Sequence, residues 1–200
     1  MRNRKRRMLL ALALLGFATT AAAASPVTRH EIDADTGLES WRVEAEGFSL
    51  ELVQRLPDQT RAFFQGRGFD AVLADEIARG CVFQTIAGNT AAAPDAPVIA
   101  LDLAEWRIDS GQGQRPLMLE HDWQREWERR GADPAARIAF RWALYPTRQE
   151  FHPGDYNWGM TTYGVLPGSV FDLHIVWRRG DELRQYVLKG LRCAQDIDGN

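Results

Sequence analysis

Apolar and polar residues alternate along several stretches of the chain, which is the pattern of a β-strand with one buried face. The clearest case is residues 170–179, where every second position is large and apolar: Phe171, Leu173, Ile175 and Trp177. The turn Arg179-Gly180-Asp181 follows, and alternation resumes at Leu183. Two alternating segments joined by a short glycine-containing turn predict a β-hairpin.

Shorter segments show the same alternation. Apolar residues recur at every second position from Trp41 to Leu52 with an interruption at Gly47, which predicts two short strands or one bulged strand. Further strands are predicted over residues 81–90, 98–108 and 136–146. In the last of these segments the alanines and Pro134 leave a helix as the alternative.

Helical patterns are confined to two regions. A helical pair is predicted near residues 58–79, because Asp58 and Asp70 can begin helices and a glycine-rich turn separates them. A short helix is predicted near residues 120–130, where Trp123 and Trp127 stand four positions apart. The polar residues 25–36 are predicted to form a loose arm.

These elements predict a mainly β protein with a minor helical part, an antiparallel β-sandwich of immunoglobulin-like architecture. The chain has 200 residues, enough to bury one sizeable core. We therefore expect a single mature domain over residues 25–200. The alanine- and proline-containing segment 90–97 is the candidate internal subdivision.

The first 24 residues follow the order of an export signal peptide. Arg6-Arg7 ends a short basic segment, an apolar segment runs from Met8 to Ala18, and three alanines precede Ser25. This pattern predicts cleavage after residue 24 and a periplasmic or secreted protein without a stable membrane span. The Arg6-Arg7 pair also leaves the twin-arginine export route open.

Charge narrows the choice of partner. Five of the 24 basic residues and none of the 27 acidic residues lie in residues 1–24, so cleavage leaves a formal charge of −8. Because a strongly acidic protein repels phosphate backbones, we expect no nucleic-acid partner. A protein partner in the cell envelope is the expectation that remains.

The chain contains two cysteines, Cys81 and Cys193, separated by 112 positions. In an oxidising compartment an even number of cysteines in apolar segments predicts a disulfide. Two free thiols or a thiolate metal ligand are the alternatives. No Cys-x-x-Cys sequence occurs, so nothing indicates thioredoxin-type redox chemistry.

Histidine and methionine side chains suggest a metal site as a second hypothesis. His152, Met160 and His174, with His121 as a fourth candidate, have the ligand types that suit copper, and imidazole also suits zinc. Their spacing matches no compact metal-binding motif. The histidine-containing sequence at 152–155 is also good turn chemistry without any metal.

Sequence patterns typical of a catalytic site are weaker than those that suggest a metal site. No Gly-x-Ser-x-Gly sequence occurs, and Ser169 falls on the opposite face of its predicted strand from Asp172 and His174. A hydrolase or isomerase of unrecognised type is the third hypothesis.

The leading hypothesis is a non-catalytic accessory or binding module for an envelope partner, which requires no cofactor. It uses an aromatic segment that is predicted to be a loop outside the core: Tyr156, Trp158, Met160 and Tyr163. By contrast, Trp106, Trp142 and Trp177 fall on apolar positions of predicted strands and are assigned to the core.

Overall fold

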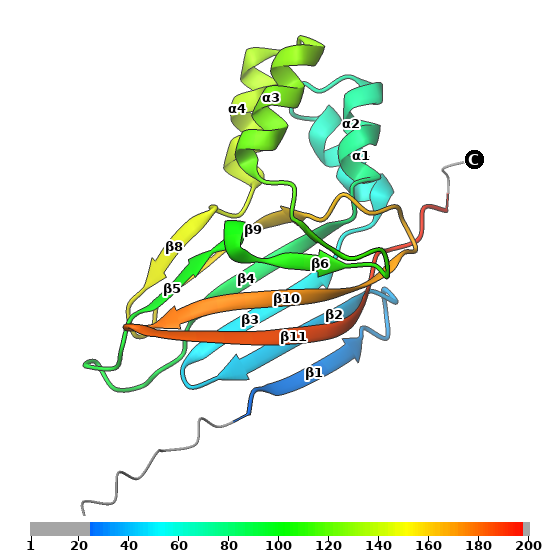
Figure 1. Ribbon diagram of the computed structural model, residues 1–200. Coiled ribbons are helices and arrows are strands. Elements are labelled where there is room, and N and C mark those ends of the chain that lie inside the picture. Colours follow the sequence, from blue (N-terminus) through cyan, green and yellow to red (C-terminus); the bar gives the residue numbers. More distant parts are fainter. Residues whose placement is uncertain (1–24, 198–200) are drawn as a thin grey trace, which may run out of the picture.

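The computed structural model describes residues 25–197 as two antiparallel sheets packed face to face, with four helices at one end (Figure 1). The predicted export signal, residues 1–24, lies outside the described residues. The predicted antiparallel sandwich with a minor helical part is confirmed.

The first sheet has the strand order β1-β2-β3-β4-β9. Its strands are β1 (Val27–Ile32), β2 (Glu39–Ala45), β3 (Phe48–Gln54), β4 (Val82–Asn89) and β9 (Tyr156–Thr162). The alternation around Gly47 forms a hairpin, because Glu46 and Gly47 have positive φ values of 48° and 93°. That backbone suits the tight turn joining two twisted antiparallel strands.

The second sheet is built around the predicted C-terminal hairpin, β10 (Val170–Arg179) and β11 (Glu182–Arg192). On the other side of β10 lie β5 (Ile99–Asp102) and β6 (Arg107–Asp109), which pair with its two halves. The outer strands β8 (Arg148–Phe151) and β7 (Gln114–Pro116) pair with β5 and β6 respectively.

The prediction of one continuous strand over 98–108 is wrong in its middle. A 3₁₀ turn, η1 (Leu103–Glu105), separates β5 from β6. The Asp102 carboxylate accepts a hydrogen bond from the Ala104 N–H at 2.9 Å and begins this turn. An aspartate that caps its own following backbone competes with the sheet for hydrogen bonds, which ends the strand locally.

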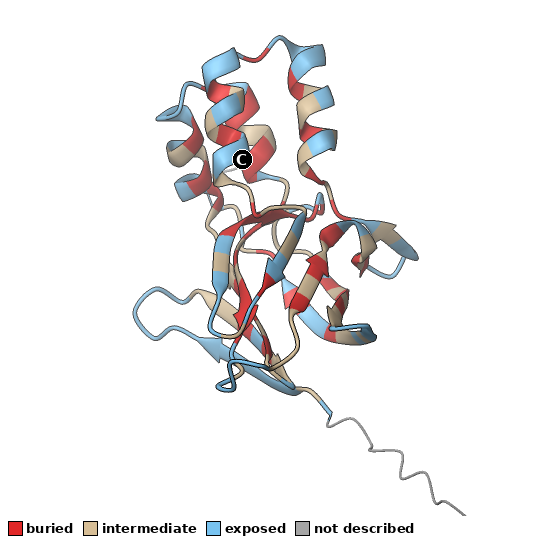
Figure 2. Ribbon diagram, turned by 90° about the vertical axis from the view of Figure 1, so that its left-hand side faces the viewer, coloured by how far each residue is buried: buried red, intermediate tan, exposed pale blue. Residues whose placement is uncertain are grey.

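Four helices form the layer at the end of the sandwich: α1 (Pro57–Gln65), α2 (Ala71–Ala78), α3 (Glu120–Arg130) and α4 (Pro134–Ala143). The helical pair near 58–79 and the helix near 120–130 match α1, α2 and α3. Buried residues line the sides on which the helices face one another (Figure 2). Their aromatic core includes Phe64, Trp127 and Phe140.

The prediction of a strand over 136–146 is wrong, because most of that segment belongs to α4. Asp133 accepts hydrogen bonds from the N–H groups of Ala135 and Ala136, and Pro134 occupies the first turn. Both features favour a helix start. Trp142, assigned to the core as a strand residue, is instead 80% exposed.

The main core lies between the two sheets and contains Trp41, Trp106 and Trp177. Residues of both sheets belong to this one cluster, and the loop over 90–98 connects β4 of one sheet to β5 of the other. The predicted disulfide is confirmed: Cys81 and Cys193 are bonded, with their Cα atoms 5.4 Å apart. It joins the start of β4 to the residue after β11.

The loose arm predicted over 25–36 contains strand β1, which pairs along its full length with β2. All six β1 residues are exposed. None of the helices within residues 25–197 is both long and apolar enough to cross a membrane.

Candidate binding site

The prediction of a loop over the aromatic segment is wrong, because residues 156–162 form strand β9, which pairs with β4. Three of the predicted partner-binding residues lie on one face of this strand. Because side chains alternate along a strand, Tyr156, Trp158 and Met160 all point away from the sandwich core. Tyr156 is 72% exposed and Trp158 is 64% exposed. Met160 is buried because the helical layer covers that end of the strand.

The neighbouring strand β4 supports this row of side chains. In the antiparallel register Gly88 lies opposite Tyr156 and Ile86 lies opposite Trp158. A Cβ atom at Gly88 would come within 2.6 Å of the Asp155 carbonyl oxygen and 2.8 Å of the Tyr156 Cβ. Glycine is therefore required here for the backbone to bring Tyr156 onto the sheet.

Helix α4 contributes a second exposed tryptophan to the same region. Trp142 and Trp158 both line a groove of about 340 Å³ on the outer face of the first sheet, below α1 and α4. We call it the aromatic groove. Its lining residues are Arg55, Phe63, Arg67, Gln84, Ala139, Trp142, Ala143, Trp158 and Met160.

The charged residues of the aromatic groove are both arginines, Arg55 and Arg67. The Arg67 guanidinium carbon lies 3.3 Å from the centre of the Phe63 ring, and an Arg67 N–H donates to the Phe63 carbonyl at 3.0 Å. These contacts hold Arg67 flat against the groove wall. The Arg55 Nε is buried and has no hydrogen-bond partner among the described residues.

The exposure of the tryptophans separates this groove from the rest of the molecule. The other five tryptophans are at most 3% exposed: Trp41, Trp106, Trp123, Trp127 and Trp177. Both exposed tryptophans of the chain therefore meet at one groove. Grouped exposed aromatic rings beside arginine have the composition of an interface centre.

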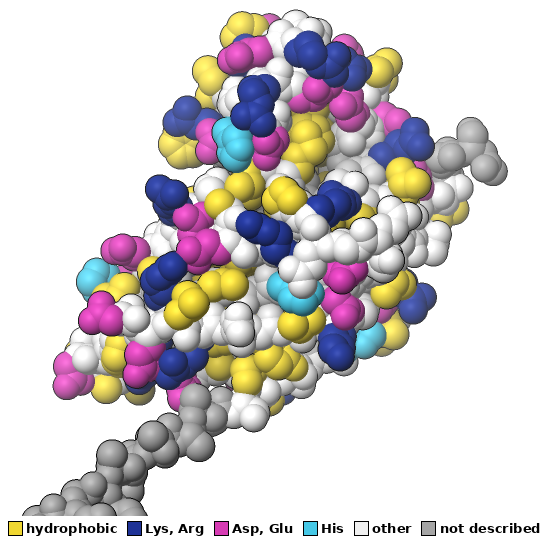
Figure 3. Space-filling view, viewed as in Figure 1, with side chains coloured by type: hydrophobic (Ala, Val, Ile, Leu, Met, Phe, Trp, Pro, Cys, Tyr) yellow, Lys and Arg dark blue, Asp and Glu magenta, His cyan; other side chains and the backbone are white. Residues whose placement is uncertain are grey.

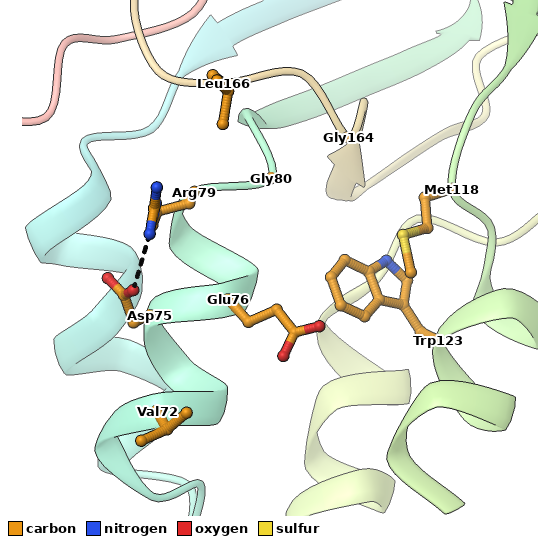
Figure 4. Close-up of a pocket in the computed structure, with 9 residues that line it drawn as sticks. All are labelled: Val72, Asp75, Glu76, Arg79, Gly80, Met118, Trp123, Gly164 and Leu166. Atoms are coloured by element: carbon orange, nitrogen blue, oxygen red, sulfur yellow. Dashed lines mark ion pairs between the residues drawn. The ribbon is translucent and has the colours of Figure 1, made fainter. Parts of the chain in front are cut away.

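A second groove, of about 430 Å³, lies between α2 and α3 and reaches the segment before β10 (Figure 4). Trp123 and Met118 form one apolar side, and the exposed side chains of Val72 and Leu166 form the other. We call it the interhelical groove. Sequence reasoning assigned nothing to this place.

The acidic side chains of the interhelical groove are paired with arginines. Asp75 accepts a hydrogen bond from Arg61 at 2.7 Å, and Glu76 accepts one from Arg130 at 2.7 Å. Arg61 also binds Asp196, which raises the pKa of the Arg61 guanidinium and lowers that of the Asp196 carboxyl. These carboxylates are occupied with structural contacts.

Tyr163 does not lie on the exposed face of β9. It follows the end of the strand, is fully buried between the sheets, and accepts a hydrogen bond from the Thr161 hydroxyl at 3.1 Å. Burial raises the pKa of the Tyr163 phenol above its ordinary value. Tyr163 stands an odd number of positions from Tyr156 and Trp158, so alternation along a strand places it on the opposite face, a signal that the loop interpretation missed.

The candidate metal ligands are not brought together. His121 lies on α3 beside Asp122, His174 lies on β10 beside Gln114, and His152 lies in the turn before β9. Met160 packs among the helices. On the face shown in Figure 3 the histidines form separate patches. Residues 25–197 contain no group of three or more His, Cys, Asp or Glu side chains arranged to hold a metal.

The residues considered for catalysis have structural contacts. The Asp172 carboxylate accepts the Gly190 N–H at 2.9 Å, and the Ser169 carbonyl accepts the Cys193 N–H at 2.9 Å. Both contacts hold β11 and the segment after it against β10.

No protein-family model, curated protein or solved structure matches this chain. The candidate site is therefore interpreted from its own geometry and chemistry.

Proposed function

We propose that this protein is a non-catalytic binding module of the periplasm or the extracellular space, and that its aromatic groove binds a segment of an envelope protein. The observation that carries the proposal is the pairing of Trp142 and Trp158, the two exposed tryptophans, at one groove. Large rings left in water on both a helix and a strand provide contact area that a partner can bury.

The residues that line the groove indicate what kind of partner segment would bind there. Phe63, Trp142 and Trp158 offer aromatic surface to apolar side chains. Arg55 and Arg67 offer hydrogen-bond donors, and no acidic residue lines the groove. The guanidinium groups of these arginines suit a carboxylate or a main-chain carbonyl of the bound segment. An extended segment with apolar residues and at least one acidic residue fits these features.

The disulfide supports the proposed compartment. A Cys81–Cys193 bond fits an oxidising environment, and such bonds are rare in proteins kept in a reducing cytosol. The basic and apolar pattern of residues 1–24 supports export to that environment.

Site-directed photo-crosslinking in the producing cells tests the proposal. A photoreactive residue replaces Gln84, which lines the groove, in one variant and Leu183, an exposed residue on β11, in the control variant. We expect position 84 to capture a defined envelope protein that position 183 does not capture. Equal capture at both positions would contradict the assignment of the groove.

The captured partner then allows a direct binding measurement. We expect Trp142→Ala and Trp158→Ala each to raise its dissociation constant by at least about tenfold, because central aromatic residues carry most of an interface's energy. The control Leu183→Ala should leave the constant unchanged. Tryptophan variants that bind the partner as tightly as the unaltered protein would overturn the proposal.

A further inference from the structure

The first sheet ends at an open edge formed by β1. Within residues 25–197 β1 pairs with β2 alone, so the backbone groups on its far side have no strand partner. All six of its residues are exposed, including Val27 at 55% and Ile32 at 64%. An edge of this kind can accept a further strand through main-chain hydrogen bonds.

The two faces of β1 have different roles. The His30 ring stacks on the buried Trp41 ring at a centroid distance of 4.8 Å, and its Nε2 lies 2.8 Å from a Glu39 carboxylate oxygen. His30 therefore covers the side of the sheet that faces the core. Arg29 and Glu31 point to the opposite face, because side chains alternate along a strand.

Neither Arg29 nor Glu31 has an ion-pair partner in the part of the chain that the structure describes. In the β1–β2 register Arg29 lies opposite Arg42, which itself pairs with Glu44 and Glu51. Glu31 lies opposite Ser40. The outer face of the edge thus presents one unpaired positive and one unpaired negative side chain, two positions apart.

We propose that β1 is a homodimer interface, in which two copies of the chain pair their β1 strands antiparallel about a two-fold axis at His30. In that register Arg29 of each copy lies directly opposite Glu31 of the other, so both unpaired charges are matched twice. Thr28 of each copy lies opposite Ile32 of the other. The first sheet then continues through both molecules.

The charges of Arg29 and Glu31 favour this strand register over the two registers shifted by one residue. Moving the axis by one residue would place Arg29 opposite Arg29, or Glu31 opposite Glu31, and like charges directly opposite each other destabilise a strand pair. The aromatic groove lies at the other end of the sheet, on β9, so dimerisation leaves it open. The inference is independent of the function proposed for that groove.

Sedimentation equilibrium of the exported protein, residues 25–200, purified with its disulfide formed, tests the dimer. Because a single strand pair is a small interface, we expect a reversible monomer–dimer equilibrium with micromolar or weaker affinity. Arg29→Glu should raise the dissociation constant at least about tenfold. The double exchange Arg29→Glu with Glu31→Arg restores the opposite-charge pairs and should restore the dimer.

The matched control is Lys189→Glu, which makes the same charge change on an exposed residue of β11 and should leave the dimer intact. A monomer at all concentrations up to the millimolar range would overturn the proposal. So would a dimer that Arg29→Glu leaves unchanged, or one that the double exchange fails to restore. Circular dichroism of each variant verifies that the fold is retained.

A cysteine at the proposed axis gives a second readout. Residues directly opposite in an antiparallel pair have Cα atoms about 4.5–5.5 Å apart, within the range that a disulfide spans. His30→Cys should therefore form a covalent dimer on mild oxidation, whereas Lys189→Cys should not. Equal cross-linking of the two variants would contradict an interface at β1.

Discussion

The indole N–H of Trp123 donates a hydrogen bond to the Thr162 hydroxyl at 2.8 Å, and both side chains are buried. The same hydroxyl donates to the Met118 carbonyl at 2.9 Å. One threonine at the end of β9 thus satisfies a donor from α3 and an acceptor from the segment before it. This contact attaches the helical layer to the sandwich beside the two grooves.

Replacing that threonine is expected to loosen the helical layer. Thr162→Val keeps the shape but leaves the Trp123 N–H and the Met118 carbonyl without their partner, at a cost of about 2–4 kcal/mol of unfolding free energy. Urea unfolding followed by tryptophan fluorescence measures the loss. Thr147→Val, at a half-buried threonine, is the control, and an equal midpoint for the two variants would contradict the role of Thr162.

The disulfide is expected to be a major contributor to stability. Cys81 and Cys193 close a loop with a sequence separation of 112 residues, so the bond restricts the unfolded chain by about 4–5 kcal/mol in the chain-entropy description. Reductant should lower the urea midpoint of the unaltered protein. The double variant Cys81→Ala with Cys193→Ala should already show the lower midpoint and should not respond to reductant.

The tryptophans are expected to divide into two classes when replaced. Trp127→Ala removes a fully buried ring from the helical core and should cost about 3–5 kcal/mol. Trp142→Ala and Trp158→Ala remove exposed rings and should change stability by less than about 0.5 kcal/mol. Thermal unfolding of the three variants makes the comparison. A large loss in Trp142→Ala would show that this ring serves packing rather than binding.

Two buried tyrosines are expected to make the protein sensitive to alkali. Burial raises the pKa of Tyr145 and of Tyr163 above the ordinary value of 10.0. The stability that these two protonated phenols contribute is fully present below pH 10. Above it the unfolded chain loses these phenolic protons while the folded chain keeps them, so stability falls as pH rises. Urea midpoints between pH 8 and pH 11.5 measure this slope.

Replacing each tyrosine by phenylalanine should change the unfolding free energy differently at neutral pH. The Tyr163 hydroxyl is hydrogen-bonded to Thr161, whereas the buried Tyr145 hydroxyl has no partner among the described residues. Tyr163→Phe should therefore cost about 1 kcal/mol, and Tyr145→Phe should be neutral or slightly stabilising. Each variant should also show a shallower loss of stability above pH 10. Equal effects at pH 7 would contradict this assignment of hydrogen bonds.

Local patterns were sufficient for part of the fold. The alternation over 170–177 and the Arg179-Gly180-Asp181 turn predict the β10–β11 hairpin, because a strand with one buried face has a period of two. Asp70 predicts the start of α2 through its own side chain, which accepts the Leu73 N–H. The cysteine pair predicts the disulfide from parity and compartment alone.

Local patterns gave the wrong element where the same pattern of apolar residues is compatible with two kinds of structure. Ile138, Phe140 and Trp142 alternate as in a strand, yet α4 buries Phe140 and leaves the other two in water. Strand β1 has no buried face at all, so nothing in its own residues distinguishes it from a polar arm. It is a strand because β2 provides a hydrogen-bonded partner.

The sequence also determined only some features of the candidate site. The sequence by itself determined that Tyr156 and Trp158 lie outside the core, but it predicted a loop where the structure has strand β9. Only the tertiary structure placed Trp142 of α4 beside Trp158, added Arg55 and Arg67, and buried Tyr163. The physical reason is that a groove is formed by surfaces from several elements, and how these surfaces meet depends on packing between distant parts of the chain.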